Sequence, residues 1–176
     1  MKSLYSLLAL PFFLNACSVL VGQVKPVDEK APLTPSEKII FPAPNWKALD
    51  IPSSNQSNED IPDAAWQSVK TAAVVSLNSV CRQKFDEDGD IKQVTRMLLS
   101  QWDGLKIDSE RPTLVAGHQA LETTGSGSYL NRQRKFQTVV VKSPTCVYDL
   151  VYLSPTETFP QELSVFQKFR DNLKLK

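Results

Sequence analysis

The chain has few residues of the kinds that bind soft metals or act as nucleophiles. Its 176 residues include one histidine, His118, and three cysteines, Cys17, Cys81 and Cys146. A zinc site is built mainly from histidine and cysteine ligands, and it needs more of them than this chain holds. The sequence therefore predicts no metal site and no cofactor.

An excess of charge of one sign is also missing. Lysine and arginine total 20 and aspartate and glutamate 19, which gives a net charge of +1. This balance argues against a nucleic-acid binder that works by neutralising phosphates. Asp86, Asp88 and Asp90 resemble the start of a calcium loop, but Ile91 and Met97 occupy the positions that such a loop gives to glycine and glutamate. We interpret this stretch as a solvated acidic loop.

No catalytic signature is present either. The stretch Gly125–Tyr129 (GSGSY) is not the Gly-x-Ser-x-Gly turn of serine hydrolases. Asp149 is a carboxylate among apolar neighbours, and it needs a partner if it is buried. We predict no catalytic residues and a chain that is not an enzyme. The alternatives are a Cys81 and His118 nucleophile pair and a small periplasmic hydrolase that uses His118 and Asp149.

The N-terminal apolar run is too short to cross a bilayer. Leu4–Leu14 (LYSLLALPFFL) spans about eleven residues after Lys2, whereas a membrane-spanning helix needs about twenty. This length is typical of a secretory signal. The run ends in Leu14-Asn15-Ala16-Cys17, which resembles the lipobox of bacterial lipoproteins. The resemblance implies a signal peptide over residues 1–16 and lipid on Cys17: a thioether-linked diacylglycerol and usually an amide-linked chain such as palmitate.

Lipid on Cys17 implies that the chain's first partner is a membrane, because two or three acyl chains anchor a protein stably. Ser18 follows the cysteine where aspartate would mark retention in the inner membrane. If the source is Gram-negative, the resemblance implies the outer membrane, with the domain facing the periplasm; otherwise it implies the cell membrane. The alternative is an ordinary secretory signal with a chance cysteine near its cleavage site.

Proline separates this N-terminus from the rest of the chain. Seven of the twelve prolines lie within residues 18–62, and no helix propagates through that spacing. We predict a lipidated N-terminus and proline-rich tether over residues 17–62, semi-extended over 18–45, followed by one domain over residues 63–176. Phe41–Leu49 is the first stretch with large apolar side chains and is a candidate initial strand.

Alternating apolar residues predict the strands of the domain. Trp66–Asn78 predicts two short strands that turn at Lys70–Thr71, and residues 106–154 predict an antiparallel meander. Its expected elements are short strands at Lys106–Asp108, Thr113–Ala116 and Gln119–Thr124, a turn at Gly125–Ser128, and strands at Gln133–Lys142 and Cys146–Ser154. Both faces of the last strand are apolar, which predicts a central strand covered on both sides.

Two helices are expected to cover that sheet. Asp90 is the expected cap of the first helix, whose apolar stripe is Ile91, Val94, Leu98 and Trp102. The second helix is expected to begin near Thr158, with Pro160 in its first turn. We therefore predict an α+β fold: a three-layer α/β/α sandwich with a mainly antiparallel sheet.

The order of these elements resembles the PsbP/Mog-like family over roughly residues 64–176. The resemblance lies in the strand ending at Ser79-Val80-Cys81, the helix and meander after it, the strand Cys146–Leu150 and the phenylalanine-rich final helix. Known members are mostly binding or assembly factors, which implies a non-enzymatic role and supplies no active-site residues. We expect a lipid-anchored envelope protein whose domain binds or scaffolds another envelope protein.

The basic residues beside the Gly-Ser stretch are the candidate contacts for an acidic partner. They are Arg132, Arg134 and Lys135, and the alternative is a solvated hairpin end.

The two cysteines that lipidation leaves free are expected to pair. An exported chain meets an oxidising compartment, and Cys81 and Cys146 allow a single intramolecular bond. Cys81 follows the Thr71–Asn78 strand and Cys146 begins another, so antiparallel neighbours would bring them together. The alternative is two separate buried thiols.

Overall fold

The computed structural model describes Phe41 and residues 43–51, 62–81 and 90–175. The predicted signal peptide, Cys17 and most of the predicted tether lie outside the described residues. Within the described ranges, neither helix combines the length and apolar content needed to span a bilayer.

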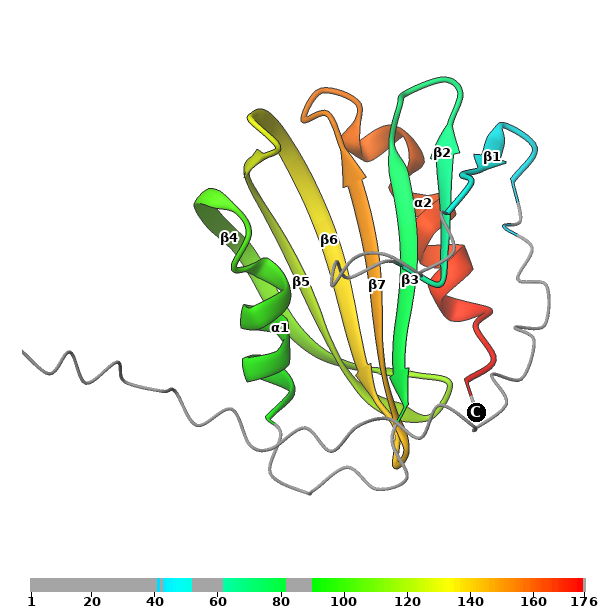
Figure 1. The fold of residues 1–176 in the computed structure, drawn as a ribbon, viewed down its shortest axis with the longest axis vertical. Helices are drawn as coiled ribbons and strands as arrows, with labels where there is room; N and C mark the ends of the chain where they lie inside the picture. The colour runs from blue at the N-terminus through cyan, green and yellow to red at the C-terminus, as the bar shows by residue number, and fades with distance from the viewer. Residues whose placement is uncertain (1–40, 42, 52–61, 82–89, 176) are drawn as a thin grey trace, which may run out of the picture. The chain divides into compact units, whose positions relative to one another are not determined.

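Seven strands form one sheet in the order β1-β2-β3-β7-β6-β5-β4 (Figure 1). Every neighbouring pair is antiparallel. The strands are β1 Trp46–Ala48, β2 Ala64–Ser68, β3 Val74–Cys81, β4 Asp103–Val115, β5 His118–Tyr129, β6 Arg132–Lys142 and β7 Cys146–Ser154; the helices are α1 Ile91–Leu99 and α2 Phe159–Asp171. The predicted α+β class with a mainly antiparallel sheet is confirmed.

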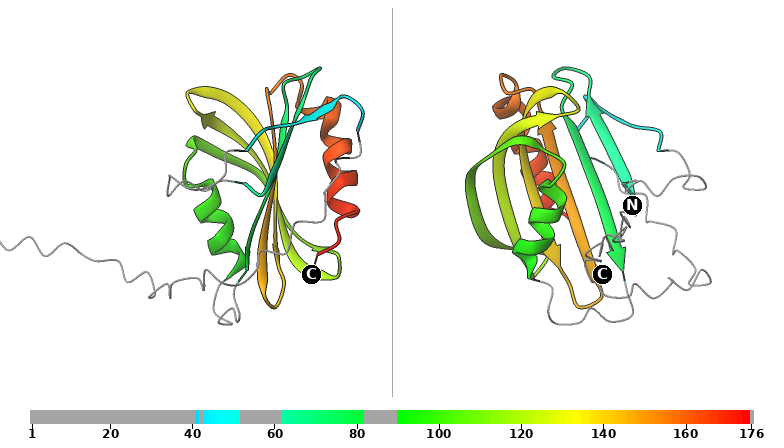
Figure 2. Two further views of the ribbon diagram at one scale, coloured as in Figure 1. Left: turned by 45° about the vertical axis from the view of Figure 1, so that its right-hand side comes forward. Right: turned by 60° about the vertical axis from the view of Figure 1, so that its left-hand side comes forward.

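The two helices lie on opposite sides of the sheet (Figure 2). α2 begins where predicted, after Thr158, and packs Phe159, Phe166 and Phe169 into the main core. The Tyr152 hydroxyl of β7 donates to the Phe159 carbonyl at 2.8 Å. Burial raises the pKa of Tyr152 to about 12, so this hydroxyl keeps its proton, and can donate, to more alkaline pH than an exposed tyrosine.

A buried carboxylate of α2 holds the turn between β2 and β3. Glu162 accepts hydrogen bonds from the hydroxyls of Thr71 and of Ser68, the latter at 2.9 Å. Ala72 in this turn has a φ of 56°. The predicted turn at Lys70–Thr71 is confirmed. It is stabilised by Glu162, a residue distant in sequence, as well as by local sequence.

The first described residues belong to this core. The Phe41 ring lies 4.7 Å from Trp46 and 4.9 Å from Phe169, centroid to centroid. Trp66 of β2 lies 5.3 Å from Phe41, and β1 pairs with β2. The expected initial strand within Phe41–Leu49 is therefore present, and the fold includes residues before the predicted boundary at residue 63.

The predicted turn at Gly125–Ser128 is wrong, because β5 runs straight through it. The chain turns at Leu130–Asn131, where both residues have positive φ angles of 50° and 59°, as a two-residue hairpin turn requires. A Cβ on Gly125 would lie 2.5 Å from the Lys106 carbonyl oxygen and 2.7 Å from the Phe136 ring. This glycine thus permits a close approach inside the sheet instead of a turn. The strands expected at 106–108 and 113–116 are one irregular strand, β4.

Replacing Gly125 by alanine is expected to lower the free energy of unfolding by about 1–3 kcal/mol, because the new methyl group meets backbone that has little room to shift. Urea unfolding followed by circular dichroism measures the change. Ser126→Ala in the same strand is the control, with an expected change below about 0.5 kcal/mol. Equal stability of the two variants would contradict the assigned role of Gly125.

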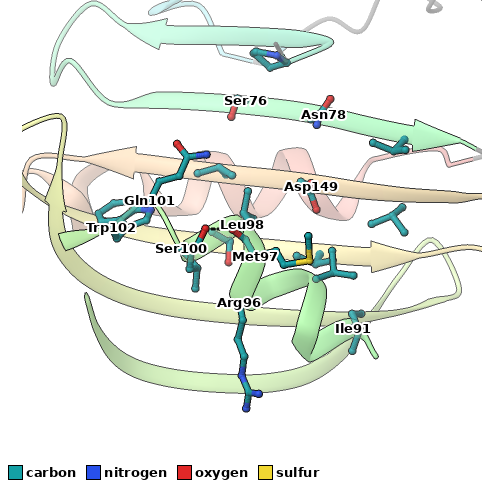
Figure 3. Close-up of a pocket in the computed structure, with 18 of the residues that line it drawn as sticks. Ser76, Asn78, Ile91, Arg96, Met97, Leu98, Ser100, Gln101, Trp102 and Asp149 are labelled. Carbon is teal, nitrogen blue, oxygen red and sulfur yellow. Dashed lines mark hydrogen bonds between the residues drawn. The ribbon is translucent and has the colours of Figure 1, made fainter. Parts of the chain in front are cut away.

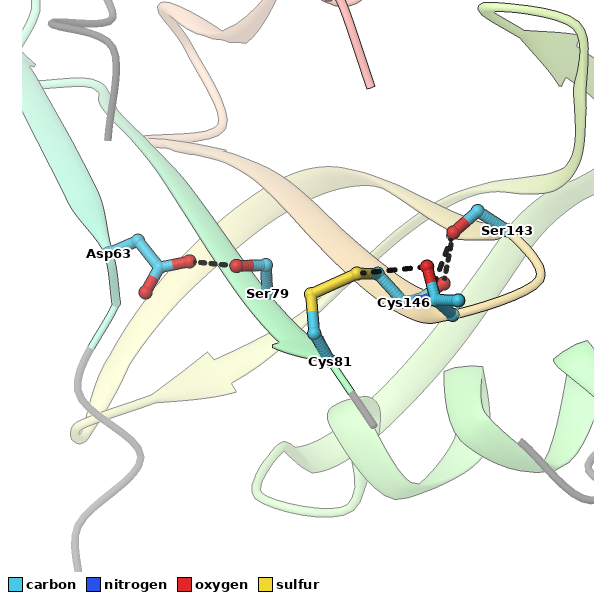
Figure 4. The surroundings of a disulfide bond; sticks show 6 residues. Asp63, Ser79, Cys81, Ser143 and Cys146 are labelled. Atoms are coloured by element: carbon cyan, nitrogen blue, oxygen red, sulfur yellow. Dashed lines mark hydrogen bonds between the residues drawn. A yellow bond between two sulfur atoms is a disulfide. The ribbon is translucent and has the colours of Figure 1, made fainter. Parts of the chain in front are cut away.

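The predicted disulfide joins Cys81 to Cys146 in the structure (Figure 4). The two residues are direct partners in the β3–β7 register, with Cα atoms 4.1 Å apart. The Cys146 amide donates to the Ser143 hydroxyl at 3.0 Å, and the Cys146 carbonyl accepts from the Ser143 amide at 2.8 Å. Because both backbone groups point toward Ser143, Cys146 faces Cys81 as a non-hydrogen-bonded pair, the kind with the closer side chains.

Candidate functional site

The described residues cover only part of the face of the sheet opposite α2. α1 contacts β5 and β6, and a groove of about 1150 Å³ lies beside it over β3 and β7 (Figure 3). α1 has nine residues, and a helix with its side chains is about 10–12 Å across. Since strands lie about 4.8 Å apart, one helix covers roughly two of them. The neighbouring strands are left open.

Alternate residues of β3 and β7 form the floor of this groove. Four cross-strand pairs follow one another along it: Val74 with Leu153, Ser76 with Val151, Asn78 with Asp149, and Val80 with Val147. The two end pairs are apolar. The central pairs carry the hydroxyl of Ser76, the amide of Asn78 and the carboxylate of Asp149. The floor is therefore apolar at both ends and polar at its centre.

α1 forms one wall of the groove. The Asp90 side chain caps the helix, as predicted, and accepts from the Lys92 amide at 3.0 Å. The predicted stripe residues Ile91, Val94 and Leu98 line the groove and are only half-buried. Thr95 and Leu99 are the buried residues of α1. The helix is thus rotated so that its apolar stripe faces sideways into the groove.

An aromatic cluster closes the groove at the end of α1. The Trp102 ring lies 4.5 Å from Phe136 and 5.3 Å from Tyr129, centroid to centroid. Gly127 leaves room for it, because a Cβ there would lie 3.3 Å from Trp102. Trp102 was predicted to belong to the helix, but α1 ends at Leu99, so the ring fixes the chain after the helix to the sheet.

A buried hydroxyl lies at the edge of the groove floor. Thr138 lines the groove and is 1% exposed, and its Oγ1 has no hydrogen-bond partner among the described residues. It stands in the same cross-strand row as Ser76 and Val151. An unsatisfied buried hydroxyl costs about 1–3 kcal/mol, and Thr123 and Gln137 carry similar atoms away from the groove, so this hydroxyl does not mark a ligand.

The predicted basic patch does not form one surface. Strand alternation puts Arg132 and Arg134 on the same face as Phe136, toward α1, and Lys135 on the opposite face. Lys135 is paired with Asp108 at 3.1 Å and lies 5.3 Å from the Phe159 ring of α2. The structure therefore divides the three candidate partner-binding residues between two faces of the sheet.

The residues of the enzymatic alternatives are not brought together either. Cys81 is held in the disulfide. Gln119 pairs with Lys142, which lines the groove, so its neighbour His118 faces the other side of the sheet from Asp149. Within Phe41 and residues 43–51, 62–81 and 90–175, no cluster of three or more His, Cys, Asp or Glu side chains could hold a metal ion.

Sequence reasoning singled out Asp149 but missed the groove around it. The sequence signal for the groove is that β3 and β7 carry apolar residues on both faces. This pattern predicted that both faces are covered by other elements. Among the described residues between β3 and β4, α1 is the one helix, and its short length was the clue that the described part of the chain leaves this face partly open. Met97, which is 68% exposed, gave no signal because it lies outside the helical stripe.

Known proteins resemble this chain in fold and not in sequence. The sequence matches no protein-family model and no curated protein. The solution structure of the cyanobacterial PsbP protein CyanoP from Synechocystis matches with a TM-score of 0.51 and 7% identity, over 76% of this chain and 83% of that one. A Pseudomonas aeruginosa protein of unknown function matches with a TM-score of 0.50 and 15% identity, over 74% of this chain and 83% of that one.

A third solved structure is LpqN of Mycobacterium tuberculosis, a protein involved in cell envelope biogenesis. It matches with a TM-score of 0.49 and 14% identity, over 74% of this chain and 78% of that one. The likeness to CyanoP supports the PsbP-like fold that the order of elements predicted.

Proposed function

We propose that this chain is a lipid-anchored bacterial envelope protein whose domain binds or scaffolds another envelope component without catalysing a reaction. The observation that carries the binding role is the groove beside α1, which has apolar ends, a polar centre and a volume of about 1150 Å³. The separation of His118 from Asp149 on opposite faces makes the hydrolase the weaker candidate.

The anchoring part of the proposal is supported by the N-terminal sequence. Leu14-Asn15-Ala16-Cys17 supplies the lipobox-like site, and the prolines after it favour an extended spacer that holds the domain away from the lipid surface. The proposed location is the outer membrane, facing the periplasm, in a Gram-negative cell, and the cell membrane otherwise. We further interpret the fold as an α/β/α sandwich in which α1 is an incomplete outer layer.

Replacing Cys17 by serine is expected to move the protein from the membrane fraction to the soluble fraction or to leave it as an uncleaved precursor, because the lipid acceptor is gone. Membrane fractionation, with mass spectrometry of the N-terminus, measures both effects. Ser18→Ala is the control and should stay anchored, while Ser18→Asp should shift the protein to the inner membrane of a Gram-negative cell. Normal processing and membrane partitioning of Cys17→Ser would refute the anchor.

A further inference from the structure

We infer that one corner of the domain dips into the surface of the membrane that carries the lipid anchor, where it contacts anionic phospholipids. This hairpin corner is the turn between β5 and β6 together with the residues that lead into β4. Its members are Trp102, Leu105, Tyr129, Leu130, Arg132 and Arg134. The inference rests on the anchoring part of the proposed function and adds the surface of the domain that meets the membrane.

Leu130 stands where neither burial nor turn chemistry favours a leucine. Its side chain is 80% exposed, the highest value among the large hydrophobic residues of the described ranges. Its φ of 50° lies in the left-handed region, where a two-residue hairpin turn favours asparagine, aspartate or glycine. A bulky residue there is strained, and such strain clusters at functional sites. A contact outside the domain therefore accounts for Leu130 better than the fold does.

Aromatic and apolar side chains surround the base of this tip. Tyr129 is half-buried, and its ring lies 5.3 Å from the ring of Trp102, centroid to centroid. Leu105 is 39% exposed, and its Cα would lie 3.4 Å from a Cβ on Gly127, so the start of β4 lies against the hairpin. Tryptophan and tyrosine are enriched where a membrane meets water, because each has an apolar body and a polar end. The corner therefore has the composition of a membrane interface.

The two arginines of the corner supply positive charge on the same face. Arg132 is exposed and Arg134 is half-buried, and strand alternation puts both on the face that carries Tyr129. Asp103 on the neighbouring strand is acidic, but it pairs with Ser128, so alternation puts it on the opposite face. Basic side chains beside a membrane are attracted to anionic lipids. The charge of this face therefore favours an anionic lipid surface.

The corner projects from one end of the sheet together with a second exposed turn. Val74, Leu153 and Phe136 form one row across the sheet, and the β2–β3 and β5–β6 turns both lie beyond this row (Figures 1 and 2). In the β2–β3 turn, Val69 is 57% exposed and the exposed Lys70 follows it. The same end of the domain thus presents two apolar tips, each beside a basic residue.

The proposed anchor brings the membrane within reach of this end. Cys17 and Phe41 are 24 positions apart in the sequence, a length of chain that spans at most about 80–85 Å. β5 has 12 residues and is therefore about 40 Å long, so the tether can place either end of the sheet at the membrane. The contact is then intramolecular, and a weak affinity is sufficient.

The size of the corner favours a lipid surface over a protein partner. A stable protein interface takes about 20–30 residues from each side, whereas the hairpin corner has six. A few apolar and basic side chains are enough for a weak contact with a membrane when a lipid anchor supplies most of the binding. A protein partner and a second copy of the chain are therefore outcomes for the test to exclude.

Photo-crosslinking to lipid tests the inference on the full, anchored chain. The protein is purified from membranes with p-benzoylphenylalanine in place of Leu130 and reconstituted in vesicles of phosphatidylcholine and phosphatidylglycerol at three to one. Leu114 is the matched control position, because it is 69% exposed and lies at the opposite end of the β4–β5 pair. We expect mass spectrometry to find a phospholipid adduct at Leu130 and none above background at Leu114.

A charge reversal tests the part played by the arginines. Arg132→Glu is expected to lower the yield of the Leu130 adduct by about fivefold or more, because each basic residue near an anionic leaflet contributes roughly a factor of five. Vesicles of phosphatidylcholine alone should also lower the yield. Lys92→Glu makes the same change in net charge at the exposed start of α1 and should leave the yield unchanged. Thermal unfolding checks that the two variants fold alike.

Replacing Leu130 by asparagine separates the membrane contact from the fold. Asparagine adopts a positive φ more readily than leucine, so this variant is expected to unfold at a higher temperature than the parent. With the photoreactive residue at Leu105 instead, the same variant is expected to give about tenfold less lipid adduct or lower, because the tip has lost its apolar side chain. A purely structural leucine would not show this opposite pair of effects.

Several results would overturn the inference. They are equal lipid adducts at Leu130 and Leu114, an adduct only with a second copy, equal yields from Arg132→Glu and Lys92→Glu, or no lipid adduct at Leu130. If the chain sediments with the vesicles and Leu130 captures no lipid, the anchor stands and the assignment of the corner fails. If Cys17 carries no lipid and the chain stays in solution, the proposed anchor fails and the inference fails with it.

Discussion

Replacing Glu122 by glutamine is expected to lower the free energy of unfolding by roughly 1.5–3 kcal/mol, the usual contribution of hydrogen bonds to charged groups. Glu122 lies on β5, and its side chain is 8% exposed. One carboxylate oxygen accepts from Arg170 of α2, and the other accepts from Arg111 of β4 at 2.8 Å. Without the negative charge, Arg170 keeps its own charge and loses its buried carboxylate partner, while it stays paired with the exposed Asp171 at 2.7 Å.

The two arginines differ in burial, and this difference makes the prediction specific. The Arg170 side chain is 14% exposed and that of Arg111 is 68% exposed. Burial lowers the pKa of Arg170, but hydrogen bonds and charge from Asp171 and Glu122 outweigh it, so the pKa is raised overall. The guanidinium therefore stays charged in the variant, with only the exposed Asp171 left to compensate it.

Urea unfolding of matched variants measures the contribution of each arginine. Arg111→Ala is expected to cost less than about 1 kcal/mol, as for an exposed pair. The double variant Glu122→Met with Arg170→Met is expected to be more stable than Glu122→Gln, because it removes the buried guanidinium together with its buried partner. Equal losses from Arg111→Ala and Glu122→Gln would show that Arg170 does not carry the effect.

The local pattern of apolar residues correctly predicted the strands in which buried residues alternate and the helices in which they recur every three or four positions. The hairpin at Lys70–Thr71, the faces of β7 and the start of α2 at Thr158 were all readable, because each depends on neighbouring residues. The ion pair between Glu122 and Arg170 was not, because its partners lie 48 residues apart and meet only when α2 crosses the sheet. Gly125 was misread for the same reason: the ring that needs its space, Phe136, is on the next strand.

The groove shows a second limit of sequence patterns. The alternation of side chains along β3 and β7 indicated that both faces of these strands are apolar. This is a property of the strands alone. Whether a face is covered depends on the number and length of the helices that remain to cover it. Within the described part of the chain, α2, with 13 residues, covers its side, whereas α1, with nine, leaves the groove beside it. The position of the candidate site therefore depends on how the helices pack on the sheet, which no sequence motif encodes.

Loss of the disulfide is expected to lower the free energy of unfolding by about 4 kcal/mol in the chain-entropy model, because the bond closes a loop between residues 65 positions apart. Such a loss is a large share of the total stability of a small domain. The measurement compares urea unfolding of the oxidised domain with that of the Cys81→Ser, Cys146→Ser double variant. Reductant should destabilise the parent protein and leave the double variant unchanged.

The disulfide also fixes the end of the groove, because Val80 and Val147, the last apolar pair on its floor, adjoin Cys81 and Cys146 in the same register. Without the bond, only backbone pairing holds this end of β3 to β7, and strand ends open more readily than the middle of a sheet. Amide exchange is therefore expected to rise at these residues through local opening, whereas Val75 and Leu150 exchange only through global unfolding and change by no more than the loss of global stability. A thiol assay on the unfolded, unreduced mature protein should detect no free cysteine, and two titratable thiols would show that the pair does not form.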